Sequence, residues 1–257
     1  KYRNCFILKG GMLISAMVGI DSRATMDIDT TLRNYPLNCE SAEQIVRQIA
    51  DVEIDDKISF VIKKTEEIME ESEYQGVRLS LDAYLDKTRI PLKIDISTGD
   101  VITPCEISFS YQLMFENRTI PLLAYPPETV LAEKLETILS RGEANTRLRD
   151  FYDVYILQRE DFVVTPDALR YALLATCRKR GHEDLLHTYA SILDGVRQSG
   201  AMRTQWMKYQ SDFDYAAGIS WDTVVDTVET LCMKTLDDHA FGDELPQEES
   251  QFEMHLL

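Results

Sequence analysis

The hydrophobic positions of this chain change their spacing near residue 125. Before that point they often alternate with polar positions, and after it they recur at helical intervals. Alternation predicts strands, because successive side chains of a strand point to opposite faces. The first part predicts helices over 12–18 and 41–51 and strands over 24–32, 58–69, 77–85 and 90–97. The second part predicts helices over 128–141, 147–158, 166–180, 184–195, 199–215 and 221–235.

Local signals indicate where several of these elements begin or end. Ser41 has the residue type of a helix cap, and Thr165-Pro166 supplies a cap followed by a proline at the first helical position. Tyr125-Pro126-Pro127 ends the strand region, because consecutive prolines cannot continue a hydrogen-bonded ladder. Strands followed by a run of helices predict an α+β fold.

We expect two lobes with a cleft between them and a separate tail. The predicted divisions are a mixed-sheet α/β lobe over 1–125, a helical lobe over 126–236 and an acidic tail over 237–257. The tail holds seven acidic and no basic residues, so it is expected to be disordered or to bind a partner. The whole chain has 27 basic and 44 acidic residues, a net charge of −17. This charge argues against a long DNA duplex as partner, although a short RNA end at a local basic patch is compatible with it.

Composition limits the cellular compartments and the kinds of metal site that we expect for this protein. No apolar run is long enough to span a membrane, and the first residues lack a signal-peptide pattern, so we expect a cytoplasmic protein. The five cysteines are scattered, which is typical of buried reduced thiols. His182 and His187 are five residues apart, which does not fit a helical zinc pair. Carboxylates remain as metal ligands, and they favour Mg²⁺ or Mn²⁺.

The segment with the most chemical information contains Asp27 and Asp29. In a strand these two side chains project together, about 6.5–7 Å apart, while Met26 and Ile28 are expected to turn to the core. Two neighbouring carboxylates repel each other unless a cation neutralises them, and a divalent metal held this way also binds triphosphate oxygens. Taken alone, the same pair is also typical of solvated charge on a strand.

Two further pieces of the first lobe bear on the same chemistry. Lys9-Gly10-Gly11 precedes a predicted helix, where glycines allow a phosphate to approach backbone N–H groups; a tight turn is the structural alternative. Asp95 lies on the polar side of the strand over 90–97. It is either a third metal ligand, a general base, or a solvated strand aspartate.

The helical part carries charged residues that suit a triphosphate. Lys134 provides a single flexible ammonium, whereas the neighbouring Glu133 is expected to point elsewhere. Asp150 and Asp153 share one helix face, with Arg147 one turn before Asp150; a surface salt-bridge ladder is the alternative.

Other clusters in the helical part have structural interpretations. Arg178-Lys179-Arg180 is typical of a solvated helix end, with contact to RNA phosphate as the alternative. Trp206 and Trp221 are expected to pack between helices.

These pieces together resemble a known family. A Gly-Gly turn, a helix and Asp-x-Asp on the next strand resemble the DNA-polymerase-β-like nucleotidyltransferase superfamily. With Ala132-Glu133-Lys134-Leu135 and the segment 147–154, residues 5–158 resemble the AbiEii/AbiGii toxins of type IV toxin–antitoxin and phage-abortive-infection systems. Arg149 departs from the family pattern, in which lysine is commonest. The resemblance leaves the last 100 residues without a motif.

The resemblance implies a metal-dependent toxin enzyme with an antitoxin partner. It would use Mg²⁺ or Mn²⁺ to transfer a nucleotide from an NTP to a hydroxyl of RNA, such as a tRNA 3′ end, or of a protein. The expected catalytic residues are Asp27, Asp29, Asp95, Lys134, Asp150 and Asp153, and the expected metal ligands are Asp27, Asp29 and Asp95. The expected nucleotide-binding residues are Lys9, Gly10, Gly11, Arg23, Thr25, Lys134, Arg147 and Arg149. The alternative is a non-catalytic NTP-binding protein controlled by a cognate antitoxin.

Overall fold

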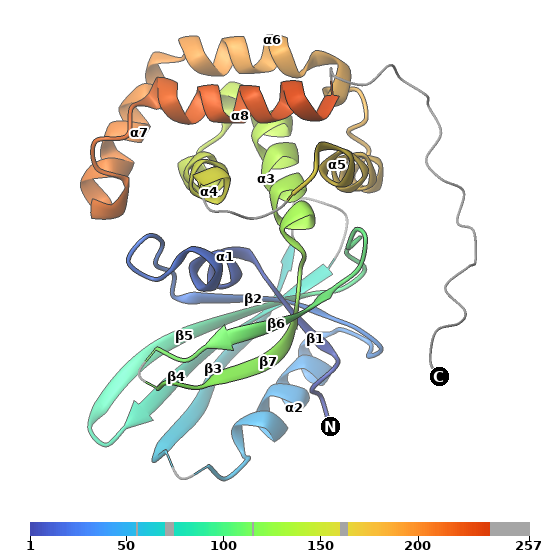
Figure 1. The fold of residues 1–257 in the computed structure, drawn as a ribbon. Helices are drawn as coiled ribbons and strands as arrows, with labels where there is room; N and C mark the ends of the chain where they lie inside the picture. The colour runs from blue at the N-terminus through green and yellow to red at the C-terminus, as the bar shows by residue number, and fades with distance from the viewer. Residues whose placement is uncertain (55, 70–74, 115, 160–163, 237–257) are drawn as a thin grey trace.

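One mixed sheet of seven strands is followed by a helical region in the computed structural model, which describes residues 1–54, 56–69, 75–114, 116–159 and 164–236 (Figure 1). The first part contains β1 (Phe6–Lys9), α1 (Gly10–Val18), β2 (Asp27–Leu32), α2 (Cys39–Ala50), β3 (Ile58–Met69), β4 (Gln75–Leu85), β5 (Thr88–Ser97), β6 (Ile107–Gln112) and β7 (Thr119–Ala124). The helical region contains α3 (Pro127–Arg141), α4 (Leu148–Arg159), α5 (Pro166–Arg180), α6 (Leu185–Gln198), α7 (Gly200–Asp212) and α8 (Trp221–Leu236). The predicted α+β class is confirmed, while the predicted tail over 237–257 lies outside the described residues.

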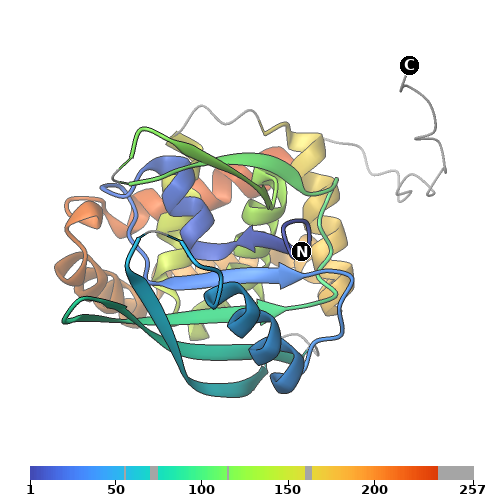
Figure 2. The ribbon, with the colours of Figure 1, turned by 90° about the horizontal axis from the view of Figure 1, so that it is seen from below.

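The sheet has the strand order β3-β4-β5-β2-β1-β7-β6. β2 pairs in parallel with β5 on one side and antiparallel with β1 on the other. Helix α2 covers one face of the sheet, and α1 with the helical region covers the other (Figures 1 and 2). The polar residues on that second face of β2 and β5 therefore lie between the sheet and the helices.

Most predicted elements coincide with observed ones within a few residues, and three corrections concern the first lobe and the cysteines. The strand expected over 24–32 begins only at Asp27, and Met26 is 65% exposed, so it does not turn to the core. Ser41 does not cap α2: Asn38 is the cap, because its side chain accepts from the Ser41 N–H while Ser41 Oγ accepts from the Asn38 N–H. The cysteines are free thiols as expected, but Cys105 is exposed.

The helical region differs from its prediction in one helix. The helix expected over 199–215 stops at Asp212 and is followed by a short 3₁₀ turn, Asp214–Ala216. Trp206 and Trp221 are buried with ring centroids 5.9 Å apart, which confirms their packing role. None of the helices described here is long and apolar enough to cross a membrane.

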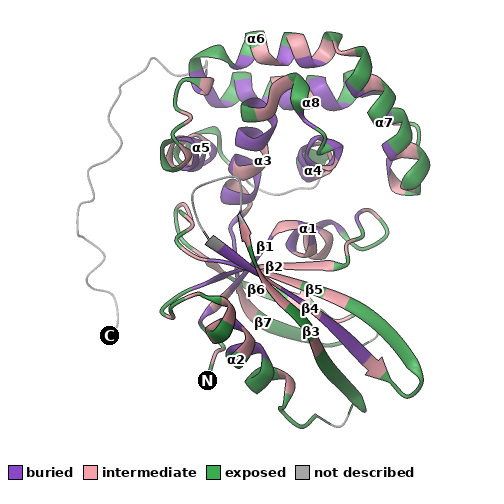
Figure 3. Ribbon diagram, turned by 180° about the vertical axis from the view of Figure 1, so that it is seen from behind, coloured by how far each residue is buried: buried purple, intermediate pink, exposed green. Residues whose placement is uncertain are grey.

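The apolar core has two parts. The larger part joins α1 and β1 to the helical region, with Leu13, Ile14, Leu135 and Phe151 fully buried in it. The smaller part lies between the sheet and α2. Figure 3 shows the buried residues along the inner sides of the helices. Because α1 belongs to the larger core, its buried side packs against the helical region.

Candidate active site

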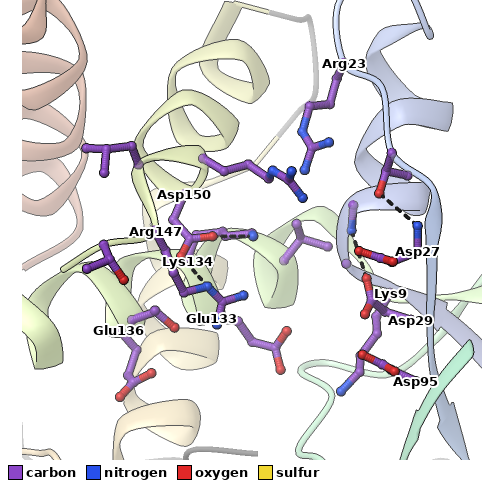
Figure 4. A pocket seen from close by; sticks show the side chains of 18 of the residues that line it. Lys9, Arg23, Asp27, Asp29, Asp95, Glu133, Lys134, Glu136, Arg147 and Asp150 are labelled. Carbon is purple, nitrogen blue, oxygen red and sulfur yellow. Dashed lines mark hydrogen bonds and ion pairs between the residues drawn. The ribbon is translucent and has the colours of Figure 1, made fainter. Parts of the chain in front are cut away.

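A cavity of about 980 Å³ lies between the sheet and the helical region and is lined by both. Figure 4 shows Asp27, Asp29 and Asp95 on its sheet side, with Lys134 and Asp150 across from them. The structure therefore brings together strand carboxylates and helical charges that are more than 30 residues apart in the sequence.

Strand pairing places the carboxylates side by side. Asp29 on β2 is directly in register with Asp95 on β5, so both side chains project from the same face of the sheet. Burial raises the pKa of Asp29 above its ordinary value, and the neighbouring charge of Asp95 raises it further, while Lys9 and the Gly11 N–H act in the opposite direction. Asp27 also lines the cavity, and its backbone N–H lies 3.4 Å from Thr25 Oγ1.

The Gly10-Gly11 turn is shaped by its contact with Asp29. Gly10 has a φ of +62°, and a Cβ at this position would lie 2.2 Å from Asp29 Oδ2. The Gly11 N–H donates to the same oxygen at 3.3 Å. A Cβ on Gly11 would lie 3.1 Å from both Arg23 Nη2 and Thr25 Oγ1. The two glycines therefore allow a carboxylate to lie against the N-terminus of α1.

Lys9 lines the cavity, and its ammonium contacts Ser97 and Asp100. Its Nζ donates to Ser97 Oγ at 2.7 Å and forms an ion pair with Asp100 at 3.0 Å. Burial acts to raise the pKa of Asp100, but Lys9 and the hydroxyls of Ser97 and Thr31 outweigh burial and hold that pKa below its usual range. Lys9 is therefore paired with Asp100 at the edge of the cavity, and its nucleotide-binding role stays a prediction.

Asp95 has a partner that sequence reasoning missed. Arg78 on β4 donates from Nε to Asp95 Oδ1 at 2.7 Å and from Nη2 to Asp95 Oδ2 at 2.6 Å. The hydrogen bond to Asp95 raises the pKa of the Arg78 guanidinium. The alternation of Arg78 with the buried Val77 and Leu79 is the sequence signal that placed it on the polar face, but its partner depended on strand register.

Across the cavity, Lys134 is held by two aspartates of α4. Its Nζ lies 2.6 Å from Asp150 Oδ1 and 3.0 Å from Asp153 Oδ2. Burial acts to lower the pKa of Lys134, but the two carboxylates outweigh burial and raise it. Lys134 and Asp150 line the cavity, whereas Asp153 is fully buried behind them and pairs with Arg23 Nε at 2.7 Å. Arg23 is only 1% exposed, lines the cavity and links the α1–β2 loop to the helical region. Its nucleotide-binding role stays a prediction.

The remaining predicted nucleotide-binding residues are more accessible. Arg147 is half-exposed, with its Nε 3.4 Å from Asp150 Oδ2. The Arg149 guanidinium lies over the Phe213 ring at 5.8 Å. Thr25, Arg147, Arg149 and Phe213 all line the cavity. These two arginines are therefore placed to reach an anion in the cavity.

Two sequence-based expectations about the helical side are wrong. Glu133 does not point elsewhere but lines the cavity beside Lys134. Arg180 is not part of a solvated helix end: its side chain is 24% exposed, lines the cavity and pairs with Glu136 and, at 3.6 Å, with Glu133. His182 Nδ1 also lies 2.7 Å from Glu136 Oε1. Glu136 and His182 were missed because neither sits in a recognisable motif.

Among the strand carboxylates, Asp27 and Asp29 have the chemistry to hold a divalent cation at the cavity. In the part of the chain that the structure describes, no group of three or more His, Cys, Asp or Glu side chains is arranged to hold a metal ion. Both Asp95 oxygens accept hydrogen bonds from Arg78, and the role of Asp95 as a third metal ligand stays a prediction. Mg²⁺ commonly binds through one or two carboxylates and completes its shell with water and substrate phosphates. Asp27 and Asp29 match that pattern.

Comparison with known proteins identifies the family of the chain. The family described as nucleotidyl transferase AbiEii toxin, type IV TA system, matches residues 1–227. A crystal structure described as a "putative nucleotidyltransferase from H. pylori" is similar at 15% sequence identity and a TM-score of 0.46, covering 93% of this chain and 91% of that chain. The structure of JHP933 from Helicobacter pylori has the same identity and TM-score, with 91% and 87% covered. No curated protein matches the chain. Because the family match spans most of the sequence, the chain belongs to the AbiEii nucleotidyltransferase toxins of type IV toxin–antitoxin systems.

Proposed function

We propose that this protein transfers a nucleotidyl group from an NTP to an acceptor hydroxyl with the help of Mg²⁺ or Mn²⁺ held by Asp27 and Asp29. The observation that carries the proposal is that one cavity is lined by this aspartate pair, by Lys134 and by Arg147 and Arg149. The bound cation would neutralise triphosphate oxygens.

The triphosphate would lie between α1 and α4. The Gly10-Gly11 turn offers the N-terminus of a helix, where backbone N–H groups favour an anion. Asp150 and Asp153 largely compensate the positive charge of Lys134 and hold its ammonium in place. Lys134 would therefore act as a positive charge at a fixed position in the cavity wall. Arg147 and Arg149 supply the additional positive charge. A chain with a net charge of −17 needs such a local group of cations to attract an NTP.

The acceptor is a hydroxyl, and two classes of acceptor are proposed. Its oxygen would form a bond to the α-phosphorus while the bond from that phosphorus to pyrophosphate breaks. Membership of a toxin family favours an RNA end, such as the 3′ end of a tRNA, with a protein side chain as the second class. The cavity walls would hold both substrates in line and exclude water. We further propose that a cognate antitoxin controls the enzyme.

Incubation with each of four α-labelled NTPs tests the reaction and the acceptor together. Total RNA and a protein extract are supplied in separate reactions, and we expect labelled product and pyrophosphate release to depend on added Mg²⁺ or Mn²⁺. Asp29→Ala and Asp27→Ala should abolish both signals. Asp21→Ala is the matched control, because Asp21 is an exposed aspartate of the α1–β2 loop that does not line the cavity.

The same experiment decides between catalysis and simple binding. NTP binding by the unaltered protein without any labelled product or pyrophosphate would contradict the proposed activity and favour a non-catalytic binding protein. Induction of the chain in cells gives an independent readout: growth should stop with the unaltered protein and continue with Asp29→Ala. Growth arrest that persists in Asp29→Ala would also favour the binding protein.

A further inference from the structure

The sheet side of the cavity continues outward as an exposed strand face. Asp27 on β2 is directly in register with Lys93 on β5, two residues along from the Asp29–Asp95 pair. Directly paired residues project from the same face of a sheet, and neighbouring strands lie about 4.8 Å apart. Lys93 is exposed and is not among the residues that line the cavity. Its side chain therefore projects beside Asp27, just outside the cavity.

The row that begins at Asp27 reaches β3, the edge strand of the sheet. Lys93 pairs with Ser80 on β4, and Ser80 pairs with Lys64 on β3. Lys64 is exposed, and its Nζ lies 2.6 Å from Glu66 Oε2. Lys93 has no ion-pair partner among the residues that the structure describes. Its charge is therefore available to a ligand that passes the aspartate pair.

Two more cations lie further out on the same face. Asp82 and Tyr84 follow Ser80 at two-residue intervals along β4, so they share its face. Lys63 Nζ is 4.0 Å from Asp82 Oδ2, and Arg89 Nη1 is 3.7 Å from that oxygen. Both cationic side chains are more than half exposed, whereas Asp82 is buried. The half-buried Tyr84 is in register with Arg89, so an aromatic ring lies beside these charges.

This face of β3, β4 and β5 differs in charge from the chain as a whole. Four exposed cations share it with two carboxylates, whereas the whole chain has a net charge of −17. Figure 3 shows exposed parts of β3 and β5 extending away from the helical region. The basic strand face, as we call it, consists of Lys63, Lys64, Tyr84, Arg89 and Lys93.

A single RNA strand has the chemistry that this face would bind. Cations interleaved with an aromatic ring bind the phosphates and bases of single strands. RNA carries a phosphate at every nucleotide, whereas a protein segment would need several acidic residues in succession. From Lys93 to Arg89 the face extends about 13 Å along β5, away from the aspartate pair. A strand whose terminal hydroxyl reached Asp27 would therefore place its preceding phosphates over these cations.

We propose that the basic strand face binds the phosphodiester backbone of the acceptor RNA and leads its terminal hydroxyl to the aspartate pair. This inference rests on the proposed nucleotidyl transfer, and it selects RNA over protein as the acceptor. Lys93 would contact the phosphate nearest the reacting end. Lys63 and Arg89 would contact phosphates further along the strand, and Tyr84 would stack on a base. Contacts of this kind position a strand without reading its sequence.

Lys93→Gln tests the proposal in transfer assays, with Lys234→Gln as the matched control. Lys234 is exposed on α8, which lies on the far side of the helical region from the sheet (Figure 1). We expect KM for a short single-stranded RNA with a free 3′ hydroxyl to rise about fivefold in Lys93→Gln. The double variant Lys63→Gln/Arg89→Gln should show at least as large a rise. KM for the NTP should stay the same in both, because none of these side chains lines the cavity, and Lys234→Gln should change neither value.

Direct RNA binding separates a phosphate contact from a structural role. Fluorescence anisotropy of the same RNA, labelled at its 5′ end and measured without NTP, gives Kd at several salt concentrations. Each phosphate contact with a single strand contributes about 0.7 to the slope of log Kd against log salt concentration. Lys93→Gln should lower this slope by about that amount, whereas Lys234→Gln should leave it unchanged. Lys93→Arg should keep the slope, because the guanidinium carries the same charge.

The possible results are distinguishable. An unchanged KM for RNA and an unchanged salt slope in Lys93→Gln and in Lys63→Gln/Arg89→Gln, alongside an inactive Asp29→Ala, would overturn the RNA-binding role of the face and leave the transferase intact. Transfer to proteins alone, with no labelled RNA, would overturn that role as well. RNA binding that weakens in Lys93→Gln, in a protein that transfers no nucleotide to any acceptor, would support the face and overturn the proposed function instead.

Discussion

A buried ion pair between Arg23 and Asp153 joins the α1–β2 loop to α4 of the helical region. Asp153 is fully buried, and Arg23 is 1% exposed. The Arg23 Nε donates to Asp153 Oδ1 at 2.7 Å, and Lys134 lies 3.0 Å from the other oxygen. Asp153→Asn keeps the shape of the side chain and removes its charge, so that a buried guanidinium loses its counter-charge.

The size of the effect follows from which charges are left behind. Breaking a buried ion pair by removing one partner costs about 3–5 kcal/mol of the free energy of unfolding. Asp150→Asn is the matched control on the same helix. In that variant Lys134 keeps Asp153, and the half-exposed Arg147 is solvated, so the loss should be about 1–3 kcal/mol. We expect Asp153→Asn to lose at least about 1 kcal/mol more than Asp150→Asn.

Urea unfolding followed by the fluorescence of Trp206 and Trp221 measures both variants, because these two tryptophans are buried in the helical region. Burial acts to raise the pKa of Asp153, but Lys134 and Arg23 outweigh burial and lower it. Its stabilisation is therefore complete above the unfolded carboxylate pKa of about 3.9, and it disappears as pH falls through the lower, folded pKa. Equal losses for the two variants near neutral pH, or a difference that grows on acidification, would refute this account.

Three further predictions concern the sheet side of the cavity. Gly10→Ala should abolish turnover, because the added Cβ would clash with Asp29 at a position with a left-handed φ of +62°. Gly19→Ala is the control: its φ is +90° but nothing lies near its Cβ, so it should lose about 1 kcal/mol of stability and keep its activity. Equal activity of the two variants would contradict this geometry. Burial raises the pKa of Asp29, so its ionised form costs stability above the unfolded pKa; metal-free Asp29→Asn should melt higher than the unaltered protein near neutral pH, and the gain should vanish below about pH 4. Arg78→Gln should lower the free energy of unfolding by about 1–3 kcal/mol without metal. Mn²⁺ should raise the melting temperature of this variant more than that of the unaltered protein, because the freed Asp95 carboxylate becomes available as a ligand. An identical response to Mn²⁺ would contradict this role for the freed carboxylate.

Local sequence determined most of the elements of this fold. The start of α5 follows from Thr165 and Pro166, since a cap and a first-turn proline act within a few residues. Period-two alternation predicted β3, β4 and β5 to within a few residues. The α2 cap was misplaced because Asn38 and Ser41 are partners in one capping box, and either residue type is typical of a cap. Errors of this kind move an element's end without changing its type.

Residue types and spacing also predicted the separate pieces of the candidate site. A pair of aspartates two residues apart, a glycine turn before a helix and a lysine with aspartates on helices each have a local pattern. The family resemblance joined these pieces, and the family match over residues 1–227 confirms that membership. The roles assigned to the individual residues stay predictions.

Only the tertiary structure decided which charges meet. The sequence predicted Lys9 and Arg23 as nucleotide-binding residues but did not predict that they pair with Asp100 and Asp153. The register of β4, β5 and β2 put Arg78 on Asp95, and the packing of α5 against α3 brought His182 to Glu136. The periodicity of a helix or strand is set by residues that are close in the sequence, whereas a charged side chain can pair with many residues that are distant in the sequence. Which partner it finds depends on strand register and helix packing, which are fixed only when the whole core closes.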